Sequence, residues 1–108
     1  MDTRPVIAFV HGDFGNGESS FRKVAEEIGA GYRTILLDRP GFDTGAAHPE
    51  RYTFREDASA ALSELSGRGV DTFHLVAHSY GALVAIAMAL QAPERIKSLH
   101  LIEPPLLR

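Results

Sequence analysis

Four short apolar runs divide the chain at regular intervals, and they constrain the fold more than any other feature. The runs cover residues 6–10, 34–37, 73–77 and 98–102. Most of them are apolar at consecutive positions, whereas a strand with one solvated face alternates apolar and polar residues. Consecutive apolar residues are typical of parallel strands that are covered on both faces. The runs therefore predict a parallel sheet with helices on both sides.

The segments between the runs have the periodicity of helices. Apolar residues recur at three- and four-residue spacing in segments 21–28 and 54–65, and a third, more apolar segment covers 83–90. Thr53 and Glu56 have the spacing of a helix cap just ahead of the second segment. Strand and helix alternate along the chain, which predicts an α/β fold: a three-layer sandwich with a four-stranded parallel sheet and right-handed crossovers.

Length and composition exclude several classes of protein. The 108 residues are enough for one domain, and 44% hydrophobic with 23% charged residues is ordinary for a globular chain. The formal charge is −3 and the arginines are scattered, so we expect no nucleic-acid partner. No apolar stretch approaches the roughly 18 residues of a membrane span. The chain has no cysteine, which excludes thiolate metal sites and fits a reducing compartment. We expect a cytoplasmic domain without metal, cofactor or membrane partner.

The turn after the third run carries the strongest chemical signal. Ser79 follows an expected buried strand and opens a helix, with Ala77 two residues before it and Gly81 two residues after it. A sharp strand-to-helix bend lifts a serine hydroxyl out of a sheet and requires small residues at both positions. The amide of Tyr80 would then point towards a negative oxygen beside the serine. The alternative is that Ser79 merely caps the helix.

The turn after the first run leaves three interpretations open. Residues 12–19 resemble a phosphate-binding loop, except that Glu18 stands where that loop needs lysine. The same glycines resemble a dinucleotide site in reversed spacing, for which Asp38 would bind a ribose. In the third interpretation, the turn supplies a second backbone N–H to an oxyanion hole, from Asp13.

Taken in order, the motifs of these turns and strands resemble the α/β-hydrolase superfamily. They are VHGDFG at 10–15, LDRPGF at 37–42, AHSYGA at 77–82, PERI at 93–96 and LIEP at 101–104. The resemblance implies an esterase-like serine hydrolase with Ser79 as nucleophile and with the amides of Asp13 and Tyr80 as oxyanion hole. It implies no cofactor. The residues that would support this site structurally are His11, Gly12 and Gly81.

The resemblance covers only the central part of the family fold. The four runs match the family's third to sixth strands, so we expect residues 1–108 to form a single partial domain, without the lid and the C-terminal strands. The family's catalytic histidine follows its last strand, beyond the region matched here. We therefore expect the isolated chain to be weakly active or inactive. Glu103, at the end of the fourth run, is a candidate triad acid, or it simply terminates a strand.

None of the chain's histidines is favoured as the general base. His11 belongs beneath the predicted oxyanion loop, and His78 points away from the serine because adjacent residues at a bend diverge. His74 and His100 belong below the rim of the sheet, with His74 expected to face a helix. His48 follows the second run in a loop and is the only histidine free to swing.

Two further classes of function stay open. A non-catalytic derivative could use the hydrolase scaffold for self-association, because the exposed edge of the fourth strand could form a homodimer across a two-fold axis. A nucleotide-binding βαβ module would use Asp38. The favoured hypothesis is a serine hydrolase for a small-molecule, ester-like substrate.

Overall fold

The computed structural model describes residues 2–12, 16–39 and 53–105, with only the backbone at position 18. One parallel sheet has the strand order β2-β1-β3-β4. The strands are β1 (Val6–Val10), β2 (Arg33–Leu37), β3 (Phe73–His78) and β4 (Ile96–Ile102). The helices are α1 (Gly17–Ile28), α2 (Phe54–Gly67), α3 (Tyr80–Gln91) and the short 3₁₀ helix η1 (Pro93–Arg95). The predicted alternation of strand and helix is confirmed.

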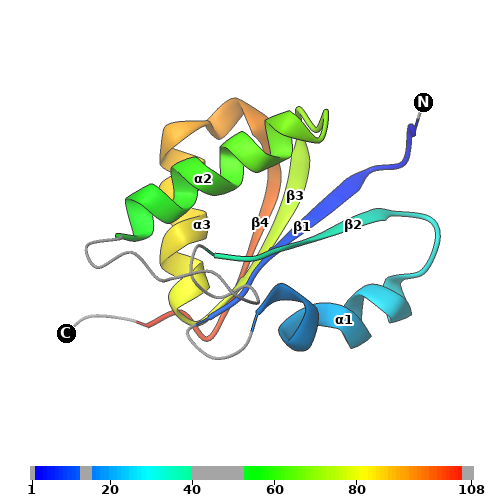
Figure 1. Cartoon of the computed structure of the whole chain (residues 1–108), viewed down its shortest axis with the longest axis horizontal. Coiled ribbons are helices and arrows are strands. Elements are labelled where there is room, and N and C mark those ends of the chain that lie inside the picture. The colour runs from blue at the N-terminus through cyan, green and yellow to red at the C-terminus, as the bar shows by residue number, and fades with distance from the viewer. Residues whose placement is uncertain (1, 13–15, 40–52, 106–108) are drawn as a thin grey trace.

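The helices form two outer layers around the sheet (Figure 1). Helices α2 and α3 lie on one face, where their apolar residues pack on Ala8, Val10 and Leu75 in a shared core. Helix α1 lies on the other face, where the rings of Phe9 and Phe21 stand 5.0 Å apart. This is the predicted three-layer α/β sandwich.

The helices begin where polar side chains satisfy their first N–H groups. Helix α1 starts at Gly17, ahead of the predicted position 21, because the Asn16 side chain accepts from the amide of Ser19 at 2.8 Å. The predicted cap of α2 is confirmed: Thr53 Oγ1 accepts from the amide of Glu56 at 3.3 Å. No helix within the described residues is long and apolar enough to cross a membrane.

The prediction that the strands are covered on both faces is wrong for β3 and β4. Burial alternates along β3, and in β4 no residue is fully buried. Helix α1 packs on β1 and β2. The same face of β3 and β4 therefore has no helix among the described residues. Within the described part of the chain, β4 also forms an edge of the sheet, since it pairs there with β3 alone.

Candidate active site

The chain bends sharply at Ser79, between β3 and α3. Its φ of 56° and ψ of −125° belong to a backbone conformation that L-residues rarely adopt. The residue is half-buried, and its side chain makes no capping hydrogen bond to α3. The alternative interpretation, that Ser79 serves as a helix cap, is therefore wrong. The geometry is that of a strand–turn–helix bend that presents a serine at the rim of the sheet.

Small residues make this bend sterically feasible. A Cβ atom on Gly81 would lie 2.5 Å from the carbonyl oxygen of His11 and 2.6 Å from that of Val10, so only glycine fits. Ala77 is fully buried. A Cβ atom on Gly12 would lie 3.1 Å from the Cβ of Ser79, so the end of β1 runs directly beside the serine. The predicted close approach of the two turns is thus present.

Backbone hydrogen bonds fix the bend to its surroundings. The amide of Ser79 donates to the carbonyl of Ile102 at 2.9 Å, and the amide of Ala82 donates to the carbonyl of Ser79 at 2.8 Å. Tyr80 is the first residue of α3, where a helix leaves its N–H groups without an intrahelical acceptor. Tyr80 therefore has the backbone position that the oxyanion-hole prediction requires. The other predicted donor, Asp13, lies outside the described residues.

His11 is a buried, neutral imidazole that supports the turn after β1. Its Nε2 accepts from the amide of Arg39 at 3.0 Å, so the ring proton is on Nδ1, which donates to the carbonyl of Gly12 at 2.7 Å. Burial lowers the pKa of the His11 imidazole and thus keeps it uncharged. Both nitrogens are engaged, so His11 has the supporting position that the sequence indicated and cannot take a proton from Ser79.

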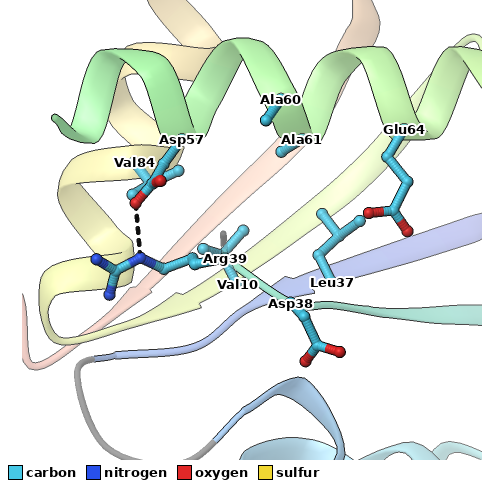
Figure 2. A pocket seen from close by; sticks show the side chains of 9 residues that line it. All are labelled: Val10, Leu37, Asp38, Arg39, Asp57, Ala60, Ala61, Glu64 and Val84. Atoms are coloured by element: carbon cyan, nitrogen blue, oxygen red, sulfur yellow. Dashed lines mark hydrogen bonds and ion pairs between the residues drawn. The ribbon is translucent and has the colours of Figure 1, made fainter. Parts of the chain in front are cut away.

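Sequence reasoning did not identify a buried ion pair beside the bend. Arg39 Nε donates to Asp57 Oδ2 at 2.8 Å, and the side chains are only 6% and 3% exposed (Figure 2). The guanidinium carbon of Arg39 also stands 4.4 Å from the centroid of the Tyr80 ring. Arg39 is part of the LDRPGF motif, but its partner is 18 residues away on α2. No local sequence pattern connects the two.

Glu103 lies next to the bend with His78 as its partner. Nε2 of His78 donates to Oε1 of Glu103 at 3.3 Å, and the glutamate side chain is 82% exposed. Among the described residues, Ser79 Oγ makes no hydrogen bond to an imidazole. The structure thus brings a histidine and a carboxylate to the rim beside the serine without linking them to its hydroxyl.

The other histidines lie apart from the bend. His74 does not face a helix as expected; it lines a hollow of about 190 Å³ together with His100. The hydroxyl of Ser98 lies between them, 2.6 Å from His74 Nδ1 and 3.0 Å from His100 Nε2. His48 falls outside the described residues. Within the described part of the chain, no three metal-ligating residues are grouped around one point.

Asp38 opposes the nucleotide-binding interpretation. Its Oδ1 accepts from the amide of Gly17 at 2.7 Å, at the N-terminus of α1. A dinucleotide site would place a pyrophosphate at that helix end. Here a carboxylate occupies the position, and Figure 2 shows the Asp38 side chain turned away from Asp57.

Comparison with known proteins agrees with this geometry. A sequence model of the α/β-hydrolase fold matches residues 5–107. The chain belongs to the α/β-hydrolase family. An α/β-hydrolase relative from Arabidopsis thaliana, probable lysophospholipase BODYGUARD 2, is 33% identical over 94% of this chain and 23% of its own length. The 2-hydroxy-6-oxo-6-phenylhexa-2,4-dienoate hydrolase of Burkholderia cepacia is 33% identical over 83% of this chain and 32% of its length.

Solved structures contain the same arrangement within larger chains. A hypothetical protein of Pseudomonas aeruginosa PAO1 is 35% identical, with a TM-score of 0.81 over 99% of this chain and 38% of its own. A membrane phospholipase A, described as a bacterial virulence factor, is 25% identical, with a TM-score of 0.87 over 100% of this chain and 35% of its own. This α/β-hydrolase chain thus spans between 23% and 38% of the length of these relatives.

Proposed function

We propose that this chain carries the nucleophile half of a serine hydrolase that cleaves small-molecule carboxylic esters. The observation that carries the proposal is the strained, half-buried Ser79, whose hydroxyl caps no helix. Strain of this kind gathers at functional sites, where the surrounding structure maintains it. The family membership and the names of the lysophospholipase and phospholipase relatives support ester chemistry.

We propose the following reaction. Ser79 Oγ attacks the ester carbonyl carbon, and the carbonyl oxygen becomes an oxyanion that the amides of Asp13 and Tyr80 stabilise. The serine proton passes to an imidazole outside these 108 residues, which then protonates the departing alcohol. Water hydrolyses the acyl-serine and releases the carboxylic acid. Glu103 is proposed as the acid that orients this imidazole.

Turnover of the isolated chain should be slight. A serine hydroxyl is a weak nucleophile near neutral pH unless a base takes its proton. Both nitrogens of His11 are engaged, and the His78 imidazole donates to Glu103 and not to Ser79 among the described residues. We therefore propose that the chain holds the serine and oxyanion donors while the base is supplied from elsewhere.

A fluorophosphonate probe tests the nucleophile. Ser79 Oγ bonds to phosphorus, fluoride leaves, and the hydroxyl proton goes to solvent base. We expect slow labelling confined to Ser79, measured by intact mass and peptide mapping. Ser79→Ala should abolish it, whereas Ser63→Ala, on the exposed side of α2, should label like the wild type. Label retained in Ser79→Ala, or spread over surface serines, would refute the nucleophile. Fast stoichiometric labelling would instead refute the proposal that the chain lacks a catalytic base.

A second candidate, self-association through β4, is favoured by the apolar residues near that edge. Leu99 and Ile102 on β4 are exposed. A second copy could add its own β4 in antiparallel register and cover them. Light scattering should detect a dimer at high concentration that Leu99→Lys dissociates and that Val24→Lys, on α1, leaves intact. A strictly monomeric wild type contradicts this candidate.

A further inference from the structure

Arg39 contacts both the turn after β1 and the first residue of α3, which carries a proposed oxyanion donor. Its backbone amide donates to His11 Nε2 at 3.0 Å, and its guanidinium stands 4.4 Å from the centroid of the Tyr80 ring. The same guanidinium donates through Nε to Asp57 at 2.8 Å (Figure 2). A single buried residue thus connects the turn after β1, the first residue of α3, and α2.

The backbone of Arg39 acts on the turn after β1 through His11. Because the Arg39 amide donates to Nε2, the imidazole carries its proton on Nδ1 and can donate to the Gly12 carbonyl. That carbonyl belongs to the planar peptide group that joins Gly12 to the next residue. The N–H of this peptide group is the first proposed oxyanion donor. The hydrogen bond from His11 fixes the Gly12 carbonyl in the turn that runs beside Ser79.

The side chain of Arg39 acts on the start of α3 through Tyr80. A guanidinium placed over an aromatic ring is attracted by its π-electrons, more strongly in a site shielded from water. Asp57 fixes the guanidinium from α2, so the Tyr80 ring packs against a guanidinium that is itself held in place. The amide of Tyr80 is the second proposed oxyanion donor. Restricting the ring restricts the residue that carries this amide.

The ion pair itself is poorly arranged for stability alone. Burying two charges costs desolvation free energy, and a pair of this kind stabilises a fold only when its remaining polar atoms are satisfied. Asp57 is 3% exposed, yet its Oδ1 has no hydrogen-bond partner in the described structure. A matched pair of apolar side chains would fill this volume without leaving a buried polar atom unpaired. The arrangement therefore favours a role of the ion pair in orienting the Arg39 side chain.

We propose that Arg39 is a positioning residue of the oxyanion hole: it orients Tyr80 with its guanidinium, and it sets the tautomer of His11 with its backbone amide. This role rests on the proposed function of Ser79. It is transmitted through two other residues, since Arg39 itself is assigned no contact with substrate.

The variant Arg39→Lys separates the stacking from the ion pair. Lysine keeps a cation for Asp57 and the backbone amide for His11, but it lacks the planar group that lies over Tyr80. We expect the maximal rate of phosphonylation of Ser79, per folded molecule, to fall about three- to tenfold, as loss of a shielded cation–π contact implies. The probe concentration at half-maximal rate should stay unchanged. The matched control is Arg55→Lys, since Arg55 stands 5.6 Å from the Phe54 ring on the surface of α2 and should label like the wild type.

A second variant guards against loss of folding. Arg39→Met combined with Asp57→Leu removes both buried charges at similar volume, which usually preserves a fold. Circular dichroism and thermal melting give the folded fraction, and the labelling rate per folded molecule should fall as in Arg39→Lys. Wild-type rates in both Arg39 variants would overturn the positioning role and leave the proposed function intact. A wild type that is never labelled at Ser79 would overturn the proposed function, and the positioning role with it.

Discussion

Ser79 adopts a backbone conformation that is unfavourable for a residue with a side chain. Its φ is 56° and its ψ is −125°, and no hydrogen bond from its side chain to α3 offsets the strain. Such conformations cost on the order of 1–3 kcal/mol and persist because neighbouring structure enforces them. Here the enforcing contacts are the Ser79–Ile102 hydrogen bond and the close packing of Gly81 on the end of β1.

Replacing Ser79 should therefore separate stability from reactivity. Ser79→Gly relieves the strain, and we expect it to be more stable than Ser79→Ala by about 1–2 kcal/mol, because glycine alone adopts this φ freely. Both variants should lose fluorophosphonate labelling. Urea denaturation of the two variants measures the difference. Equal midpoints would mean that the backbone relaxes once the hydroxyl is gone.

At the level of elements, local patterns were predictable from sequence and the contacts between distant segments were not. The apolar run of β1 and the Thr53 cap depend on neighbouring residues, so the sequence indicated both. The Arg39–Asp57 and His78–Glu103 pairs join residues 18 and 25 positions apart. Such pairs form only when the sheet and the helices packed on it bring distant segments together. The exposed edge of β4 was expected, whereas the uncovered face of β3 and β4 was not, because a run of apolar residues does not reveal which layers cover it.

The junction between β1 and α3 offers a sharp test at this scale. Gly81→Ala places a methyl group 2.5 Å from the carbonyl oxygen of His11, so we expect a loss of about 1–3 kcal/mol in unfolding free energy. Gly67→Ala is the matched control, since nothing lies within 4 Å of a Cβ there, and the change should be neutral or slightly stabilising. Thermal melts compare the two. Equal melting temperatures would contradict the close packing of α3 on β1.

For the molecule as a whole, the buried His11 makes stability depend on pH. Burial lowers its pKa in the folded state below the usual value near 6.5. Between the two pKa values the unfolded chain binds a proton that the folded chain does not, so unfolding free energy rises with pH in this window. The stability from His11 is thus fully present above about pH 6.5 and decreases as the pH falls below it.

Acid should accordingly destabilise the protein through this residue. We expect unfolding free energy to decrease from about pH 7 towards pH 5, by at most about 1.4 kcal/mol per pH unit from His11. His11→Asn removes the titrating group and should flatten this part of the profile. Urea denaturation across this range makes the comparison. Parallel profiles for wild type and His11→Asn would disprove the assignment.

The hydrogen bond from Ser79 to Ile102 gives the outer strand a mechanical influence on the bend. The carbonyl that holds the Ser79 amide is contributed by the last residue of β4, and the far side of that strand has no partner strand among the described residues. We expect a segment that pairs with β4 to stabilise the hydrogen bond between Ser79 and Ile102. Separation of β4 from β3 should weaken this hydrogen bond. The position of the Ser79 hydroxyl should therefore depend on a strand that contributes no side chain to the attack.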